Sequence, residues 1–219
     1  MKVMISRLHF PVTVLGPGRR AGIWLQGCSI GCPGCVSRDT WDPRGGAPMT
    51  VDEVLSWIAD LSEQDRELDG ITITGGEPTE QPEALFALAV GIDRLRRRGV
   101  FTGDVLCFTG RVETEFAAAC PWAAQFIDAV ITGTFRITQP TDLLWRGSAN
   151  QRLIPLTERG RERYEPFGQA TAERPELQVT VADGQVWMIG IPRRGDLQQL
   201  EAALRRQGVA LQEVSWRPR

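Results

Sequence analysis

Residues 27–35 read Gly-Cys-Ser-Ile-Gly-Cys-Pro-Gly-Cys, so three of the five cysteines of the chain, Cys28, Cys32 and Cys35, lie within eight residues. The first residues of the chain lack the apolar core and cleavage site of a secretory signal. Clustered cysteines without such a signal indicate metal binding or catalysis rather than a disulfide framework. Thiolates are soft ligands that suit iron-sulfur clusters, zinc or Cu(I), and three glycines in the stretch let the backbone wrap closely around one centre.

The segments around this stretch alternate between strand-like and helix-like patterns. A capping box from Thr50 to Glu53 marks the start of one helix, and further helices are predicted at residues 82–98 and 112–126, the last interrupted at Pro121. Strands are predicted at residues 1–10, 22–26, 71–74, 104–108, 128–135 and 152–156. Strands that alternate with helices in this way predict an α/β fold built on a parallel sheet.

Polar or glycine-rich segments follow several of these strands. They are the cysteine stretch and residues 74–77, 109–111 and 132–133. Because ligand sites in parallel α/β folds lie at the carboxyl ends of the strands, we expect these segments to converge on one rim.

The C-terminal part of the chain has a different pattern. Residues 157–175 are charged and aperiodic and predict a linker or surface excursion. A hairpin is predicted across Asp183-Gly184, then a helix at residues 196–207 and a last strand at 210–216. The sequence thus predicts a main domain, residues 1–156, and a small α+β extension, residues 157–219.

Composition excludes several classes of function. The 219 residues are 42% hydrophobic and 24% charged, which is typical of a soluble globular protein, and no apolar run approaches the roughly 18 residues of a membrane span. A net charge of −2 gives no general attraction to nucleic acid or to an anionic membrane. The single histidine, His9, rules out a multi-histidine zinc site. We expect a cytoplasmic protein that binds neither nucleic acid nor membrane.

A structural zinc loop is the alternative of another class, in which the chain is a non-catalytic or partner-docking module. Such a site needs a fourth ligand, for which Cys107, Cys120 and His9 are the candidates. Cys107 is predicted on a buried strand and Cys120 on a helix, so both are expected to be buried hydrophobic residues rather than ligands.

Three thiolates on a [4Fe-4S] cluster would instead leave one iron open to a substrate or cofactor. A C-x3-C-x2-C motif followed about 40 residues later by a strand that ends in Gly-Gly-Glu-Pro, residues 75–78, resembles the radical S-adenosylmethionine (SAM) superfamily. Thr40-Trp41, Phe108-Thr109-Gly110 and the Arg-Gly-Ser-Ala-Asn-Gln-Arg run at residues 146–152 further resemble the small activases of anaerobic ribonucleotide reductase and related glycyl-radical enzymes. The resemblance covers about residues 5–155. Ser37, Thr132 and the extra length from Leu177 onward depart from it.

This resemblance implies a fold and an activity. The fold is a partial, open (β/α)6 barrel of parallel strands, and the cofactors are a [4Fe-4S] cluster and SAM. The activity is reductive cleavage of SAM to a 5'-deoxyadenosyl radical, which abstracts a hydrogen atom from a glycine of a glycyl-radical enzyme. A peptide or small-molecule target is the alternative, and reduced flavodoxin or ferredoxin is the expected electron donor.

The resemblance also implies roles for individual residues. Cys28, Cys32 and Cys35 would ligate the cluster. Gly75, Gly76 and Glu77 would meet the methionine amine of SAM, and Thr109 and Thr132 its carboxylate or ribose. Ser148 and Asn150 would close the pocket, while Gly34 and Val36 would lie near the adenine. Two readings stay open for Arg146 and Arg152, which either hold the SAM carboxylate or pair with nearby acids.

Overall fold

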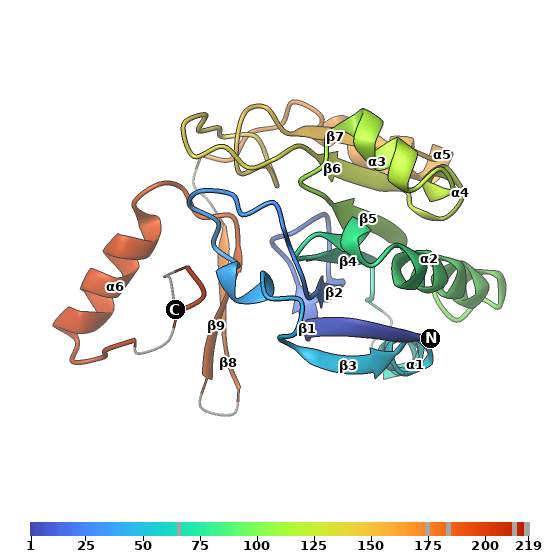
Figure 1. Ribbon diagram of the computed structural model, residues 1–219, viewed down its shortest axis with the longest axis horizontal. Coiled ribbons are helices and arrows are strands. Elements are labelled where there is room, and N and C mark those ends of the chain that lie inside the picture. Colours follow the sequence, from blue (N-terminus) through green and yellow to red (C-terminus); the bar gives the residue numbers. More distant parts are fainter. Residues whose placement is uncertain (65–66, 174–175, 183–184, 212–213, 217–219) are drawn as a thin grey trace.

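The computed structural model describes residues 1–64, 67–173, 176–182, 185–211 and 214–216 (Figure 1). The strands are β1 (Lys2–Val12), β2 (Arg20–Leu25), β3 (Ala47–Thr50), β4 (Gly70–Gly75), β5 (Asp104–Phe108), β6 (Ala129–Thr132), β7 (Arg152–Pro155), β8 (Leu177–Ala182) and β9 (Gln185–Gly190). The helices are α1 (Val51–Gln64), α2 (Pro82–Arg97), α3 (Glu113–Ala119), α4 (Ala123–Phe126), α5 (Glu158–Tyr164) and α6 (Asp196–Arg206). No helix in these ranges is long and apolar enough to cross a membrane.

Seven strands form one mixed sheet in the order β3-β1-β2-β4-β5-β6-β7. The four strands β2, β4, β5 and β6 are parallel, with Ile23 opposite Ile73 and Ile73 opposite Cys107. The α/β class and the parallel centre are therefore confirmed. The (β/α)6 barrel is not confirmed, because β1, β3 and β7 pair antiparallel to their neighbours.

The antiparallel strands follow from the connections that precede them. A parallel crossover needs a dozen or more residues, usually with a helix that returns the chain to the start of the sheet. The loop between β1 and β2, residues 13–19, is too short for this. The longer connection between β6 and β7, residues 133–151, forms turns and no helix. The chain therefore comes back beside β6 in the opposite direction.

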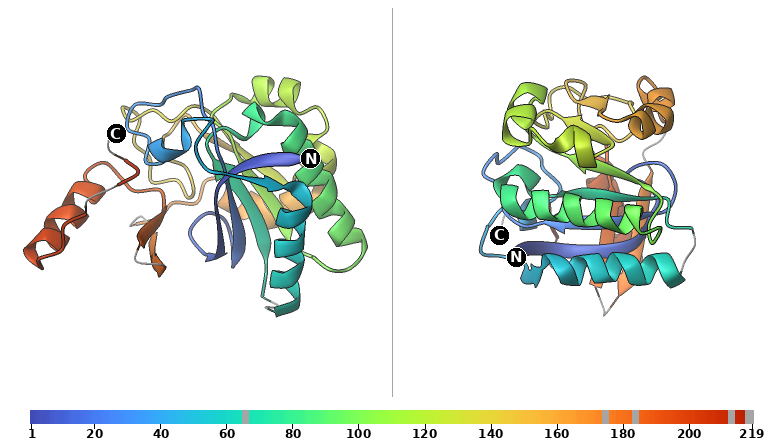
Figure 2. Two further views of the ribbon diagram at one scale, coloured as in Figure 1. Left: turned by 60° about the horizontal axis from the view of Figure 1, so that its bottom comes forward. Right: turned by 90° about the vertical axis from the view of Figure 1, so that its right-hand side faces the viewer.

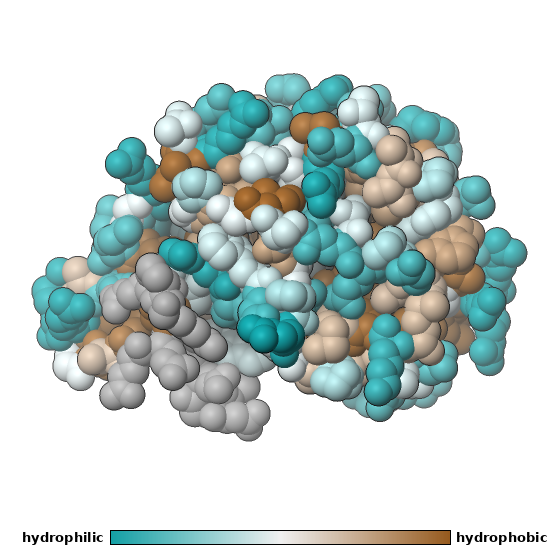
Figure 3. Space-filling view, viewed as in Figure 1, coloured by the Kyte–Doolittle hydropathy of each residue, from teal (hydrophilic) through white to brown (hydrophobic). Residues whose placement is uncertain are grey.

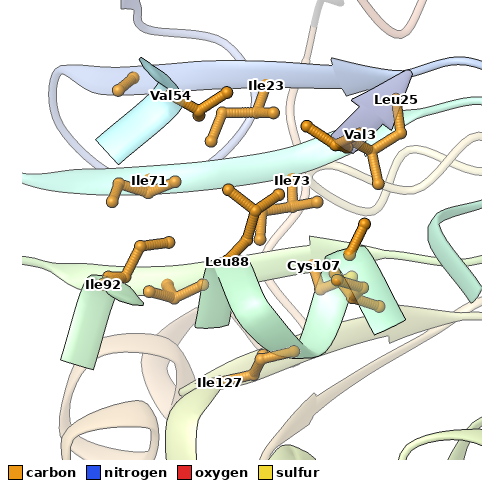
Figure 4. Packing of buried hydrophobic residues seen from close by; sticks show 14 of the residues in the cluster. Val3, Ile23, Leu25, Val54, Ile71, Ile73, Leu88, Ile92, Cys107 and Ile127 are labelled. Atoms are coloured by element: carbon orange, nitrogen blue, oxygen red, sulfur yellow. The ribbon is translucent and has the colours of Figure 1, made fainter. Parts of the chain in front are cut away.

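Helices α1 and α2 cover one face of the sheet (Figure 2). The predicted capping box is present at the start of α1, where the Glu53 backbone N–H donates to Thr50 Oγ1 at 3.1 Å and the Thr50 N–H donates to the Glu53 carboxylate at 2.6 Å. Figure 4 shows how apolar side chains of both helices and of the strands meet between these layers. This layer holds most of the buried hydrophobic side chains among the described residues. Each fully buried aliphatic side chain contributes about 1.5–3 kcal/mol to the free energy of folding.

The opposite face of the sheet is covered by later parts of the chain. Along β2, Trp24 points to this face, because its neighbours Ile23 and Leu25 belong to the core under the helices. The hairpin β8-β9 packs here through Ile189 (Figure 2). Tyr164, at the end of α5, packs against the β5 and β6 side of the same face. The sheet is thus buried on both sides.

The prediction of a linker at residues 157–175 is wrong for its first part, which forms α5. Thr157 caps this helix by accepting from the Gly160 N–H at 3.0 Å. Tyr164 is fully buried, and its hydroxyl donates to Asp104, which also receives two hydrogen bonds from Arg20, at 2.6 and 3.1 Å. The apolar periodicity of a helix is missing from this segment because one aromatic ring and buried polar contacts attach it to the sheet.

The C-terminal predictions are confirmed in two of three elements. The hairpin β8-β9 and the helix α6 are present, while the predicted turn at Asp183-Gly184 lies outside the described residues. The strand expected at residues 210–216 is wrong for the described part of that range, where the chain forms no strand. Ser215 instead uses its backbone carbonyl and its hydroxyl to contact residues that follow the cysteines.

Substitution of Tyr164 by Phe tests the attachment of α5. The loss of a buried hydrogen bond should lower the free energy of unfolding at pH 7.5 by about 1–2 kcal/mol. Burial also raises the pKa of Tyr164 above its usual value near 10. The stability linked to this proton is therefore fully present below about pH 10 and is lost as the pH rises further.

Urea unfolding at pH 7.5 and pH 11 measures both effects. The wild-type chain should lose more stability than Tyr164→Phe between these two pH values, because only the wild type carries this phenol. Equal alkaline losses in the two proteins would contradict the assignment.

Candidate functional site

The cysteines lie in a loop, residues 27–36, that leaves the carboxyl end of β2 and is called the cysteine loop below. Its start is joined to the residues that follow it: the Gly27 N–H donates to the Thr40 carbonyl at 2.7 Å and the Cys28 N–H to the Trp41 carbonyl at 3.1 Å. The Gln26 side chain donates to two further carbonyls of that return segment, at 2.8 and 3.1 Å. The loop is thus closed at its base, and the three thiols are half-buried.

Gln81 fixes the same base from the side of β4. Its amide donates to the carbonyls of Met4 and Gln26, both at 2.9 Å, and its oxygen accepts from the Met4 N–H at 2.8 Å. One side chain therefore holds the end of β2 against β1. The sequence contains no local signal for this, since the partner residues lie far from Gln81 along the chain.

Gly75 and Gly76 bring the end of β4 into contact with the cysteine loop. The Gly76 N–H donates to the Leu25 carbonyl at 2.8 Å, and the Glu77 N–H donates to the Gly27 carbonyl at 2.7 Å. A Cβ at position 76 would lie 2.1 Å from the Gly27 oxygen. Gly75 has a φ of 108°, which favours glycine. Both glycines are thus required by the approach of the two loops, independently of any ligand.

The Glu77 carboxylate is only 1% exposed and accepts four hydrogen bonds. Oε1 receives the Thr79 N–H at 3.1 Å, the Thr79 hydroxyl at 2.7 Å and the Thr109 hydroxyl at 2.7 Å, while Oε2 receives the Gly110 N–H at 2.7 Å. A buried carboxylate is tolerated only with such compensation. The side chains predicted to contact SAM, Glu77 and Thr109, are therefore hydrogen-bonded to each other.

The next loops continue the contacts along the carboxyl ends of the parallel strands. The Thr109 N–H donates to the Ile131 carbonyl at 2.9 Å, and the Gly133 N–H donates to the Arg111 carbonyl at 2.8 Å. The Thr134 hydroxyl donates to the Gly110 carbonyl, also at 2.8 Å. The segments that follow β4, β5 and β6 thus meet at one edge, which confirms the predicted rim.

Residues 148–151 form the far side of this rim. The Asn150 amide donates to the Thr134 carbonyl at 2.9 Å, and the Ser148 hydroxyl accepts from the Arg136 N–H at 3.0 Å. Ser148 and Thr132 are buried. Asn150 Oδ1 is buried and has no hydrogen-bond partner among the described residues. An orphaned acceptor of this kind fits a site that a donor group of a ligand completes.

The rim returns to the cysteine loop at two points. A Cβ at Gly34 would lie 2.6 Å from Cδ1 of Ile137, and a Cβ at Gly110 would lie 2.6 Å from Cδ1 of Ile30. The side chain of Glu80 adds a polar contact, accepting from the Ser29 N–H at 2.8 Å and from its hydroxyl at 2.5 Å. The loops after four strands therefore form a closed ring of contacts around the thiols.

The thiols sit in a partly desolvated environment. Burial, the largest cause, raises the pKa of Cys28 and of Cys32. The backbone N–H of Phe135 acts in the opposite direction on the pKa of Cys32 by hydrogen bonding to its sulfur. Such N–H groups tune thiolate-bound clusters. Donor chemistry and surroundings therefore fit a cluster held by three thiolates.

A zinc site completed by the remaining candidates does not fit the structure. Cys107 and Cys120 belong to the core beneath the helices, and burial raises the pKa of Cys120 to about 11, although a metal ligand must be a thiolate. His9 lies on β1 near Gln178 and Trp187. Throughout the described residues, no three His, Cys, Asp or Glu side chains are arranged for a single ion. A [4Fe-4S] cluster makes a different demand, since each thiolate binds its own iron.

The remaining predicted site residues have clear positions. Val36 is half-buried just after the cysteines, and Gly34 is exposed, with a φ of 80°. Arg146 donates to the carbonyls of residues 144, 167 and 168, so it is a structural group. Arg152 pairs with Glu113 at 2.8 Å at the surface. Arg152 thus pairs with an acid, as one of the two readings expects, whereas Arg146 contacts backbone carbonyls rather than acids.

Comparisons with known proteins agree with this site. A family model described as a 4Fe-4S single cluster domain matches residues 14–154. Relatives from Salmonella typhimurium and Escherichia coli K12, each named anaerobic ribonucleoside-triphosphate reductase-activating protein, are 31% and 30% identical over 145 residues, which is 65% of this chain and 93% of each relative. A relative of the same name from phage T4 is 31% identical over 148 residues, 66% of this chain and 89% of its own length.

Glu77→Gln tests the central contact of the rim. The NH2 group of the new amide would face either the Gly110 N–H or the N–H and hydroxyl donors that bind Oε1 of Glu77. Because a donor would then face a donor, the free energy of unfolding should fall by about 1–3 kcal/mol. Iron bound per chain after anaerobic reconstitution should fall at least threefold, because the carboxylate no longer fixes the turn whose backbone holds the cysteine loop. Urea unfolding and iron analysis measure the two effects.

The matched control is Glu113→Gln, which removes an exposed carboxylate from a surface ion pair and should change stability by less than about 1 kcal/mol. Wild-type stability and wild-type iron content in Glu77→Gln would show that the rim does not depend on this carboxylate.

Proposed function

This chain belongs to the 4Fe-4S single cluster domain family, and it is similar to anaerobic ribonucleoside-triphosphate reductase-activating proteins. On that premise we propose that it generates a glycyl radical in a partner enzyme. The observation that carries the proposal is the closed ring of loops that surrounds three half-buried thiols at the carboxyl ends of the parallel strands. The partner is a glycyl-radical enzyme of the anaerobic ribonucleotide reductase type.

The proposed reaction is a one-electron reduction followed by a hydrogen-atom transfer. A reduced [4Fe-4S] cluster supplies an electron that breaks a carbon-sulfur bond of SAM, which gives methionine and a 5'-deoxyadenosyl radical. The radical takes a hydrogen atom from the target glycine, and the products are 5'-deoxyadenosine and a glycyl radical. The electron comes from a reduced flavodoxin or ferredoxin, and the reaction takes place in the cytoplasm.

We assign the cluster to Cys28, Cys32 and Cys35. A cluster held by these three thiolates would leave one iron at which SAM could bind through its amine and carboxylate. In this proposal, the backbone of Gly75 and Gly76 faces the methionine amine. The carboxylate of Glu77 and the hydroxyl of Thr109 support the site by holding its loops, since both are already hydrogen-bonded within the chain.

The far side of the rim holds the rest of SAM in this proposal. Asn150, whose Oδ1 has no partner among the described residues, accepts a hydrogen bond from a ribose hydroxyl or from an N–H of the SAM amine. Thr132 and Ser148 line the same side, and Gly34 and Val36 flank the adenine. Residues 1–156 form the catalytic unit, and residues 157–219 form an extension beyond it.

The first experiment tests the cluster and the reaction together. After anaerobic reconstitution, the wild-type chain with dithionite and SAM should produce 5'-deoxyadenosine, and addition of the partner should give the EPR doublet of a glycyl radical. Replacement of Cys28, Cys32 or Cys35 by Ala should abolish both the cluster spectrum and the product.

Cys120→Ala is the matched control, because this thiol is buried in the core away from the cysteine loop. It should retain the cluster and the product. An intact cluster that yields no 5'-deoxyadenosine would overturn the catalytic proposal, and 5'-deoxyadenosine without a glycyl radical would favour a peptide or small-molecule target.

The second experiment tests the role of Asn150. Asn150→Ala should raise the KM for SAM about fivefold to twentyfold, which corresponds to the loss of roughly one hydrogen bond of 1–1.8 kcal/mol. Iron content should stay at the wild-type level, because Asn150 contacts the rim and not the thiols. An unchanged KM for SAM would exclude Asn150 from the binding site.

A further inference from the structure

The part of the chain from residue 177 to residue 216, called the distal segment below, is not explained by the proposed reaction. The family model ends at residue 154, and the enterobacterial relatives are matched over 93% of their own length by only 145 residues. The distal segment therefore adds structure to a unit that is already as long as those relatives. Figure 1 shows that it forms the hairpin β8-β9 and helix α6 beside the sheet.

The hairpin is seated on the face of the sheet opposite α1 and α2. Ile189 of β9 is only 3% exposed and packs with Val12, Leu15 and Trp24. Gln178 of β8 adds polar contacts to β1, because its amide donates to the Pro11 carbonyl at 2.7 Å and its oxygen accepts from the Thr13 N–H at 3.1 Å. The hairpin therefore has a defined position.

The end of the distal segment contacts the residues that follow the cysteines. The Ser215 hydroxyl donates to the Val36 carbonyl at 2.6 Å, and the Arg38 N–H donates to the Ser215 carbonyl at 3.0 Å. The indole N–H of Trp216 donates to Glu201 of α6 at 2.8 Å. The distal segment, which lies beyond the residues matched by the family model, is thus attached next to the proposed cluster ligands.

A cavity of about 140 Å³ lies between the distal segment and the sheet. The sheet contributes Trp24, Thr74 and Phe108, from the carboxyl halves of three adjacent parallel strands, and Val36 and Ser37 connect the cavity to the cysteine loop. The opposite side is formed by the distal segment and includes the side chains of Met188, Ile189, Leu197 and Trp216, which are called the distal wall below. The cavity thus joins the proposed radical site to the distal segment.

The chemistry of the lining restricts what it can receive. Most lining side chains are apolar or aromatic, and the charged one, Arg7, is paired with Asp39. A void of this volume is too small for a helix, which is 10–12 Å across, and suits an extended chain that inserts a single large side chain. On the face shown in Figure 3, hydrophobic side chains form only small patches among hydrophilic ones. Among the described residues of that face, no broad hydrophobic patch offers an alternative to this cavity.

We propose that the distal wall determines which protein is activated, by receiving an apolar side chain next to the target glycine in an extended loop of the partner. This inference rests on the proposed function, because that function requires a glycine Cα to reach the space beside the cysteine loop. The wall lines one side of the cavity, and Val36 and Ser37 connect the cavity to the cysteine loop. A loop with an apolar residue beside its glycine is held there, and a loop with only polar residues leaves the cavity unfilled.

Two substitutions in the distal wall test the proposal in the full, reconstituted chain. Met188→Asp places a charge in the cavity, and Leu197→Ala removes apolar volume. Glycyl-radical formation by each protein is divided by its rate of SAM cleavage without partner. The concentration of partner that gives half-maximal glycyl-radical formation should then rise at least tenfold for Met188→Asp and at least threefold for Leu197→Ala. The control Val179→Ala changes a 55% exposed residue of β8 that does not line the cavity, and should behave as wild type.

A binding experiment separates this proposal from the proposed function. The probe is a synthetic peptide of about 12 residues that copies the glycine-bearing loop of the anaerobic reductase, and tryptophan fluorescence reports binding, since Trp24 and Trp216 line the cavity. Wild type should bind it, and a peptide with the apolar neighbours of glycine replaced by serine should bind at least tenfold more weakly.

The outcomes are distinct. If peptide binding depends on the apolar neighbours of glycine and on Met188 but no glycyl radical forms, the role proposed for the distal wall is supported and the proposed activity is refuted. If Met188→Asp forms the glycyl radical with an unchanged half-saturating concentration of partner, the role proposed for the distal wall is refuted and the proposed activity is not affected. If the wild-type chain binds neither the partner nor the peptide, the role proposed for the distal wall is overturned.

Discussion

The buried carboxylate of Glu77 is the constraint on which the site depends. An ionised group that is 1% exposed must be compensated by hydrogen bonds, and the donors come from the turn after β4 and from the loop after β5. The same residue holds the cysteine loop through its backbone N–H, which donates to Gly27. One residue therefore fixes three loops relative to one another, and loss of any of its donors removes part of the compensation that its burial requires.

The sequence predicted those features of the fold that are encoded locally. The capping box at Thr50 and the apolar spacing that follows it identify α1, and short apolar runs that end in glycine identify β4 and β5. The direction of β7 and the helix α5 were not predictable in this way. The first depends on the absence of a crossover helix between β6 and β7, and the second on the contact of Tyr164 with Asp104, which lies 60 residues away along the chain.

The candidate site shows the same limit. The spacing of the cysteines and the Gly-Gly-Glu-Pro motif pointed to two loops that the structure brings into contact, because both patterns are contiguous in the chain. The separate roles within the motif were not visible in the sequence. Gly76 is required because the Gly27 carbonyl lies where its Cβ would be, and the hydroxyl of Thr109 is directed to Glu77. These relations are set by the pairing of β2, β4 and β5, so only the folded chain reveals them.

The ring of loops and the distal segment are held in place by interactions of different kinds. In the proposed function, this difference separates the radical chemistry from the selection of the partner. The ring of loops around the thiols is held by backbone groups and buried polar side chains, so a change there leaves unsatisfied groups and disturbs the whole rim. The distal segment is attached through apolar packing of Ile189 and a few hydrogen bonds at Gln178 and Ser215. Apolar walls tolerate a change of side chain more readily than networks of buried hydrogen bonds. The side chains of the distal wall can therefore be altered without disturbing the rim, as expected of an element that selects the partner while the radical chemistry stays the same.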